Sequence, residues 1–143
     1  MNTVKIKKLT SNAIVPTKQT ANSAGYDLYA SEDVSIAAHK YAAVGTGISI
    51  EMPDNIEAQV RPRSGMAFKF GITVLNAPGT IDADYRGEIR VCLINHSDTD
   101  YDVHAGDRIA QIVFAAVAPT ELMEVAQLGA TERGEGGFGS TGK

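Results

Sequence analysis

Short runs of alternating apolar and polar residues recur along this chain, and they restrict its fold more than any other feature. Such alternation is typical of strands that bury one face in a core and expose the other face to water. The clearest runs cover residues 4–7, 48–52, 56–61 and 88–95, and turn-forming Gly, Pro, Asn and Asp residues lie between them. The pattern predicts an all-β fold in the form of a sandwich, jelly roll or barrel.

One short helix is expected within this pattern. We predict one or two helical turns over Ser64–Phe70, with Met66, Ala67 and Phe70 facing the core. The chain has 143 residues and no internal repeat, so one folded domain is expected. We assign this domain to residues 1–128, and we treat residues 129–143, which hold six of the 14 glycines, as a flexible arm.

The composition excludes several classes of protein. The longest apolar run, residues 112–118, is far shorter than the roughly 20 residues that a membrane-spanning helix needs. Lys and Arg number 13 against 17 Asp and Glu, so no broad basic surface for DNA or RNA is expected. Because there is one cysteine and no apolar leader, we expect a soluble cytoplasmic protein.

Several clusters carry residues suited to chemistry, and each also has a plain structural interpretation. Asp27 lies after a glycine and is either a turn residue or a ligand. Arg63, Ser64 and Gly65 offer a guanidinium, a hydroxyl and free amides at the start of the predicted helix. This combination suits a phosphate group, and a solvated surface turn is the alternative.

The densest cluster surrounds Asp82 and Asp84. In an extended strand these two carboxylates would share one face, with Ala83 and Tyr85 on the other face. Neighbouring carboxylates suit general base catalysis, although a charged hairpin tip would explain them equally well.

Other polar residues stand within the apolar strands. Arg108 and Gln111 precede the most apolar run and would need polar partners if they are buried. Cys92 is expected to be a small buried side chain. The three histidines lack the spacing of a zinc site, both with each other and with Cys92.

The arm carries Arg133 and Phe138 among its glycines, and hydroxyls follow at residues 140 and 141. Successive glycine amides can form a concave site for phosphate oxygens, and an aromatic ring can stack on a base. The arm therefore suits a lid that orders over a nucleotide, with a disordered tail as the alternative.

Five of these clusters, in this order, resemble the five motifs of the trimeric dUTPase family. They read AGYDL at 24–28, PRSG at 62–65, GTIDADYRG at 79–87, GDRIAQ at 106–111 and RGEGGFGSTG at 133–142. The resemblance implies a homotrimer of jelly-roll-like β-barrels, each with one short helix and a Gly-rich C-terminal arm that closes over a neighbouring active site. It also implies Mg²⁺-assisted hydrolysis of dUTP to dUMP and pyrophosphate, which keeps uracil out of DNA and supplies dUMP for dTMP synthesis.

The resemblance also implies roles for individual residues. Asp82 would be the general base for the water that attacks the α-phosphorus, and Tyr85 would pack under the deoxyribose and exclude a 2′-hydroxyl. Asp27 would orient Mg²⁺ through a bound water. The uracil edge would be contacted by Asn76 and by the hairpin residues Thr80 and Ile81.

Phosphate contacts are implied for two further groups of residues. Arg63, Ser64 and Gly65 of a neighbouring chain would hold phosphate oxygens together with Gln111. The arm of the third chain would clamp the phosphates and cover the base through Arg133, Phe138, Gly139 and Ser140. Glu135 stands where the family often has a small residue, and we expect its side chain to point away from the nucleotide.

Two other functions remain open. A dCTP deaminase would share the barrel but would rely on a catalytic Glu, where this chain has Asp82. A nucleotide-dependent regulatory module would keep the pocket and the arm but would turn over slowly. Ammonia release from dCTP would indicate the deaminase, and binding without turnover would indicate the module.

Overall fold

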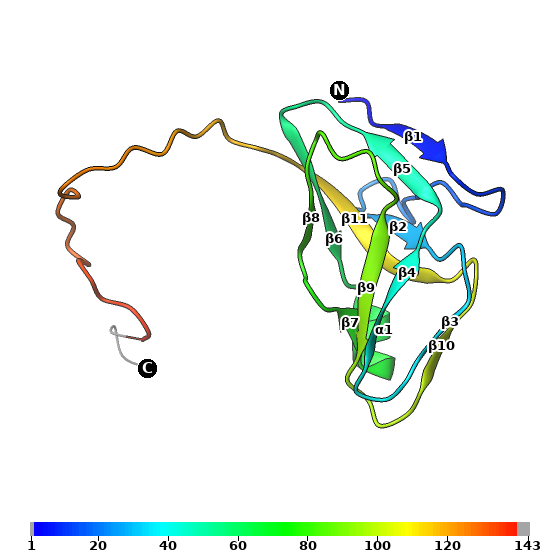
Figure 1. Ribbon diagram of the computed structural model, residues 1–143. Coiled ribbons are helices and arrows are strands. Elements are labelled where there is room, and N and C mark those ends of the chain that lie inside the picture. Colours follow the sequence, from blue (N-terminus) through cyan, green and yellow to red (C-terminus); the bar gives the residue numbers. More distant parts are fainter. Residues whose placement is uncertain (1, 140–143) are drawn as a thin grey trace.

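Antiparallel sheets built from eleven short strands surround a single apolar core (Figure 1). The computed structural model describes residues 2–139. The larger sheet has the order β2 (Tyr26–Tyr29), β11 (Arg108–Ala116), β6 (Ile56–Arg61) and β8 (Gly79–Ile81). A three-stranded sheet has the order β4 (Tyr41–Gly45), β9 (Arg90–Asn95) and β7 (Ile72–Val74). Two pairs complete the fold: β1 (Lys5–Lys8) with β5 (Ile48–Glu51), and β10 (Tyr101–Val103) with β3 (Val34–Ile36).

The alternation of apolar and polar residues along the strands places apolar side chains in the core, as predicted. In β6, Ile56, Ala58 and Val60 are buried while the residues between them are half-buried, and β9 alternates in the same way. Burying a side chain the size of valine or isoleucine contributes roughly 1.5–3 kcal/mol. The prediction of an all-β fold with one short helix is confirmed for the described part of the chain.

The helix α1 spans Ser64–Phe70, as predicted. It ends because Gly71 adopts a left-handed conformation with φ of 67°, and its N–H turns back to the carbonyls of Ala67 and Met66. The prediction that Ala67 and Phe70 face the core is wrong, since Met66 is the buried residue of this helix. Two turns lying on β7 point one side chain inward, and Phe70 instead packs on Tyr101 with ring centroids 5.4 Å apart.

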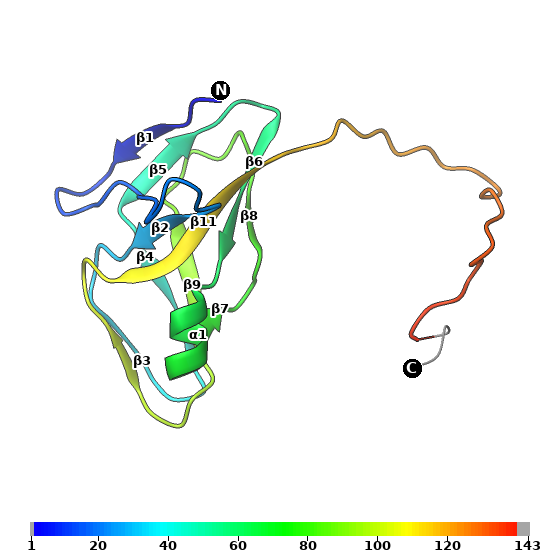
Figure 2. The same ribbon diagram turned by 180° about the vertical axis from the view of Figure 1, so that it is seen from behind.

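The chain leaves the packed sheets after β11 (Figures 1 and 2). The Val117 N–H still donates to the Asn55 carbonyl at 2.9 Å, but residues 118–139 form no helix or strand. In both views this stretch extends away from the sheets. The division of the chain at residue 129 stays a prediction. Within residues 2–139, no helix has the length and apolar character needed to span a bilayer.

Candidate active site

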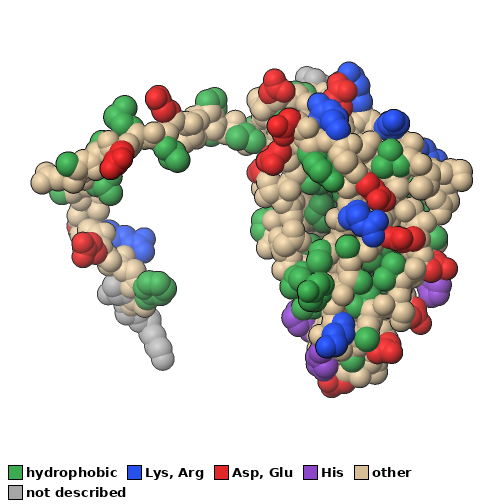
Figure 3. Space-filling model, in the orientation of Figure 1, with side chains coloured by type: hydrophobic (Ala, Val, Ile, Leu, Met, Phe, Trp, Pro, Cys, Tyr) green, Lys and Arg blue, Asp and Glu red, His purple; other side chains and the backbone are tan. Residues whose placement is uncertain are grey.

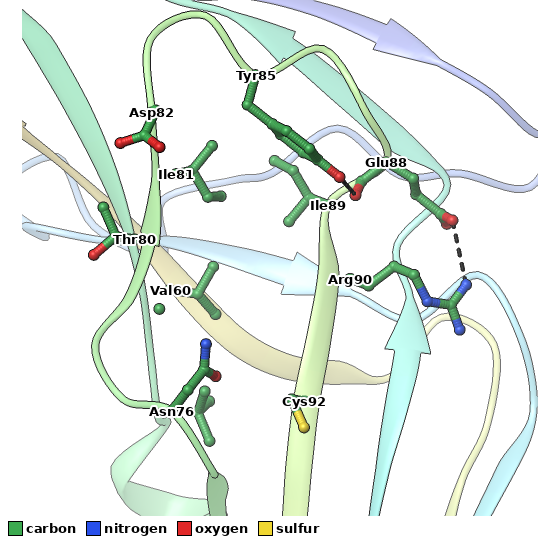
Figure 4. Close-up of a pocket in the computed structure, with 12 residues that line it drawn as sticks. Val60, Asn76, Thr80, Ile81, Asp82, Tyr85, Glu88, Ile89, Arg90 and Cys92 are labelled. Atoms are coloured by element: carbon green, nitrogen blue, oxygen red, sulfur yellow. Dashed lines mark hydrogen bonds and ion pairs between the residues drawn. The ribbon is translucent and has the colours of Figure 1, made fainter.

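A cavity of about 250 Å³ opens between β8 and β9, where the larger sheet and the three-stranded sheet separate (Figure 4). It is lined by Val60, Val74, Asn76, Gly79, Thr80, Ile81, Asp82, Tyr85, Glu88, Ile89, Arg90 and Cys92. The predicted residues Asn76, Thr80, Ile81, Asp82 and Tyr85 are therefore brought together in one cavity.

The open edge of β8 presents backbone groups to this cavity. In the part of the chain that the structure describes, β8 pairs with β6 along one edge and has no partner strand on the other. Gly79 allows a close approach here, because a Cβ at this position would lie 3.3 Å from the Asn76 amide nitrogen and 3.4 Å from the Val60 Cβ. Unpaired N–H and C=O groups at fixed spacing can recognise the polar edge of a flat ring.

Asp82 stands at the mouth of the cavity, just after the end of β8 (Figure 4). The chain turns here, since the Tyr85 N–H donates to the Asp82 carbonyl at 3.1 Å. Because residues 82–85 turn rather than extend, the extended alternative, in which Asp82 and Asp84 share a strand face, does not hold, and the alternative of a charged turn describes this segment. Asp82 is exposed and lines the cavity, whereas Asp84 does not line it.

The ring of Tyr85 forms the upper wall of the cavity (Figure 4). Its hydroxyl donates to the backbone carbonyl of Glu88 at 3.0 Å. A Cβ at Gly87 would collide with this hydroxyl, so glycine is what allows the ring to fold back onto its own loop.

A second cluster gathers three of the motifs on the other side of β6. Asp27 on β2 is buried, and its carboxylate lies 3.3 Å from the Arg63 Nε and 3.5 Å from the Arg108 Nη1. The Gln19 amide also donates to it at 2.9 Å. Gln111 donates to the Pro62 carbonyl at 2.9 Å, which ties β11 to the segment that leads into α1.

Beside this cluster lies a cationic cavity of about 370 Å³. Arg63, Lys69 and Arg108 line it, together with Gly65, Met66, Phe70, Tyr101 and Asp107. Burial, and then the nearby Asp107 carboxylate, raises the pKa of Tyr101, although Arg63 lowers it. The hydroxyl therefore stays protonated at neutral pH and can donate a hydrogen bond. Three cations and a hydroxyl donor suit an anionic group.

The donor set suits a metal ion that is carried by a ligand. Within residues 2–139, no group of three or more His, Cys, Asp or Glu side chains could hold an ion. Both oxygens of Asp27 already have cationic or amide partners, which suits contact with a metal-bound water better than direct ligation. Mg²⁺ commonly keeps several waters and takes its remaining ligands from phosphates, and this mode fits the residues present.

The predicted site residues do not all meet within one chain. The cavity between β8 and β9 and the cationic cavity share no lining residue. Ser64, at the start of α1, is exposed. In the arm, Phe138 is fully exposed and Arg133 donates to the Gly136 carbonyl, so Arg133, Phe138 and Gly139 lie away from both cavities. Ser140 lies outside the described residues.

Sequence reasoning missed part of the cavity lining. Cys92 was expected to be buried in the core, but it is half-exposed, because its side chain borders the cavity between the two sheets. Glu88 and Arg90 line the same cavity and were not predicted as site residues. The two-residue spacing of Glu88, Arg90 and Cys92 was the available signal, because such residues share one face of a strand.

Comparison with known proteins agrees with the geometry. The family model described as dUTPase matches residues 11–142. The deoxyuridine 5′-triphosphate nucleotidohydrolase of Nautilia profundicola is 55% identical over 140 residues, which cover 98% of this chain and 99% of that protein. The enzyme of the same name from Helicobacter hepaticus is 55% identical over 139 residues, which cover 97% of this chain and 88% of that protein.

Solved structures give the same result. The Staphylococcus bacteriophage 80alpha dUTPase, solved with dUPNHPP, matches all of this chain and all of its own with a TM-score of 0.93 and 27% identity. A dUTPase from phage phi11 of S. aureus, described with a structural Mg(II) ion, has a TM-score of 0.84 at 22% identity, which shows a shared fold.

Proposed function

This chain belongs to the dUTPase family and is a dUTP diphosphatase, and from that premise we propose that a water activated by Asp82 attacks the α-phosphorus of dUTP. The observation that carries the proposal is the cavity between β8 and β9, with a carboxylate at its mouth and an aromatic wall above it (Figure 4). The products are dUMP and pyrophosphate.

The base would bind beside the open edge of β8. Uracil presents two carbonyl acceptors and one N–H donor, and the backbone groups of Thr80 and Ile81 with the Asn76 amide supply complementary partners. Cytosine has an amino group in place of one carbonyl, which would leave a buried partner unpaired and cost about 1–3 kcal/mol. The walls formed by Val60, Val74 and Cys92 would exclude a methyl group at C5.

Tyr85 would lie under the deoxyribose and occupy the space that a 2′-hydroxyl needs. Its hydroxyl is already bonded to the Glu88 carbonyl, so the ring cannot swing away without breaking that bond. A wall held in this way rejects ribose by shape.

Asp82 is suited to general base catalysis because its carboxylate is exposed at the mouth of the cavity. Within residues 2–139 it has no hydrogen-bond or ion-pair partner, so it is free to accept the proton of an attacking water. A positioned general base contributes typically 10²–10⁴-fold to a rate.

The cationic cavity would hold the phosphates. Arg63, Ser64, Gly65 and Gln111 would bind phosphate oxygens, and Asp27 would contact a water of the Mg²⁺ ion that arrives with the nucleotide. When bound, this ion would neutralise phosphate charge, which explains how an acidic protein binds a polyanion.

A homotrimer of jelly-roll-like barrels would complete each site. The two cavities lie apart in one chain, and the arm extends away from both of them. Arg63, Ser64 and Gly65 from a second chain and Arg133, Phe138, Gly139 and Ser140 from a third would close the site at a subunit boundary.

The cellular role follows from the reaction. Removal of dUTP would keep uracil out of DNA, and the dUMP produced would feed dTMP synthesis. The one cysteine cannot form an internal disulfide, which fits a reducing compartment, and we place the enzyme in the cytoplasm. The ligand is a free nucleotide, with no nucleic acid or membrane partner.

Pyrophosphate release from dUTP, dCTP, dTTP and UTP, each with and without Mg²⁺, tests the proposal. We expect rapid turnover of dUTP alone, and stimulation by Mg²⁺. Ammonia released from dCTP, with no reaction of dUTP, would overturn the proposal in favour of a deaminase. Binding of dUTP without turnover would overturn it in favour of a regulatory module.

A further inference from the structure

A charged cluster lies beside the Tyr85 ring, and two of its three residues line the cavity. It consists of Glu32, Glu88 and Arg90, and the proposed reaction gives it no role. Arg90 stands between the two carboxylates, with its Nη2 2.9 Å from Glu32 Oε1 and its Nη1 3.3 Å from Glu88 Oε2. The same Nη2 donates to the Ala43 carbonyl at 2.9 Å, so the guanidinium is held from three directions.

The two carboxylates also hold the turn between β4 and β5. The Gly45 N–H donates to Glu32 Oε1 at 2.6 Å, and the Gly47 N–H donates to Glu88 Oε1 at 3.0 Å. A Cβ at Gly45 would lie 2.7 Å from Glu88 Oε1 and 2.9 Å from Glu32 Oε1. The turn therefore fits both carboxylates because residue 45 is a glycine.

The turn between β4 and β5 and the start of β5 also hold Ile89, the residue after Glu88, through hydrogen bonds. The Ile89 N–H donates to the Ile48 carbonyl at 2.9 Å, and the buried Thr46 hydroxyl donates to the Ile89 carbonyl at 2.6 Å. The carbonyl of Glu88, one residue away, is the group that accepts the Tyr85 hydroxyl. A continuous set of bonds thus runs from Arg90 through Glu88 to the Tyr85 ring (Figure 4).

An exposed ion pair by itself contributes little, with a median of about 0–1 kcal/mol. The side chains of Arg90, Glu32 and Glu88 are 45%, 43% and 29% exposed, so their charges are partly screened. The cluster affects the position of the Glu88 segment through its hydrogen bonds, because each carboxylate also accepts a bond from a backbone N–H. Loss of Arg90 would leave two like charges facing one turn, and the Glu88 segment would relax.

We propose that Glu32, Arg90 and Glu88 form a positioning cluster that holds the Tyr85 ring against the cavity and thereby sets the preference for deoxyribose over ribose. The inference rests on the proposed function, since it assigns a cause to the sugar selectivity of that site. Glu88 and Arg90 also line the cavity, and the role assigned to all three residues is to position the Tyr85 ring.

The test is the ratio of kcat/KM for dUTP to kcat/KM for UTP in three variants. We expect Arg90→Met and Glu32→Gln each to lower this ratio at least fivefold, and Arg90→Lys to retain part of it. Lys5→Met is the control, because it removes another surface ion pair, with Glu51 at the β1–β5 edge, and neither of these residues lines the cavity. We expect this control to leave the ratio unchanged.

A double-variant cycle with Tyr85→Phe separates positioning from general destabilisation. Tyr85→Phe already lacks the bond to Glu88, so Arg90→Met should change the ratio much less in that background than in the native one. Equal effects in both backgrounds, or an unchanged ratio in Arg90→Met, would overturn the inference. A native enzyme that fails to distinguish dUTP from UTP would instead contradict the proposed function.

Discussion

At the scale of single residues, position in the fold separates two aspartates that look equivalent in the sequence. Asp82 lines the cavity, whereas Asp84 lies in the following turn and points to solvent. Strand pairing ends at Ile81, and this one fact gives the two carboxylates different surroundings.

Asp82→Asn should retain dUTP binding but lose at least 100-fold in kcat, because an amide cannot accept the proton of the attacking water. Asp84→Asn is the matched control and should stay within about threefold of the native rate. Steady-state kinetics and equilibrium binding of dUTP measure both quantities. Loss of turnover in Asp84→Asn with retention in Asp82→Asn would reassign the base.

Contacts between individual side chains were the part of the site that the sequence could not predict. The motifs located Asp27, Arg63 and Gln111, but their mutual contacts join positions more than 30 residues apart, and no local pattern encodes them. The misplaced Cys92 has the same origin, since its exposure depends on the cavity that the two sheets form between them. The pairing of Glu32 with Arg90 likewise exists through the fold alone.

At the scale of elements, local signals were sufficient for several strands and for the helix. The alternating runs at 48–52 and 56–61 became β5 and β6, and the predicted helix over Ser64–Phe70 became α1. The sequence left a strand and a charged turn open at 82–85, because acidic and aromatic residues suit both, and the fold adopts the turn.

Replacing glycine by alanine at the two ends of α1 should change the free energy of unfolding in opposite directions. Gly71→Ala should destabilise the protein by about 1 kcal/mol, because a side chain disfavours the left-handed backbone at φ of 67°. Gly65→Ala should stabilise it by about 0.5 kcal/mol, since its Cβ would meet no atom within 4 Å and alanine favours a helix. Urea unfolding measures both, and a stabilised Gly71→Ala would contradict this account of the helix end.

The edge between β1 and β5 should be sensitive to acid. The hydrogen bond from Lys5, and then its charge, lowers the pKa of Glu51 below its usual 4.5, while burial raises it slightly and Arg86 lowers it. A lowered pKa means that the ionised group stabilises the folded state above pH 4.5, and that this contribution is lost as the pH falls through the lowered pKa.

Glu51→Gln should therefore unfold at slightly lower urea concentration than the native protein at pH 7, and the difference should shrink as the pH falls below 4.5 and through the lowered pKa. Parallel urea titrations over a series of pH values from neutral to strongly acidic check this expectation. A difference that persists or grows in acid would show that the Glu51 side chain acts through packing rather than charge.

At the scale of the whole molecule, the sheets and the stretch after β11 differ in where their apolar side chains lie. The sheets enclose buried apolar residues, whereas residues 118–139 expose their large side chains, including Leu122, Met123 and Leu128. Hydrophobic side chains stand out to solvent along this stretch in the space-filling view (Figure 3). Folding and catalysis should therefore be separable.

Deletion of residues 133–143 should leave the far-ultraviolet circular dichroism spectrum and the oligomeric state unchanged but remove most dUTP turnover. The arm's proposed role is to close over a bound nucleotide, and the buried core of the sheets does not depend on that closure. Sedimentation velocity and pyrophosphate release measure the two properties on the same sample. Dissociation of the oligomer on this deletion would instead assign the arm a structural role.

The exposed stretch after β11 also affects how the protein withstands proteases. Cleavage requires an extended peptide that can enter a protease active site, and residues 118–139 offer many such bonds while the paired strands offer few. A trace of protease in a preparation would remove the C-terminal motif first and leave the paired strands uncleaved. The sample would still look folded and pure while its specific activity fell, so intact mass should be recorded with every rate.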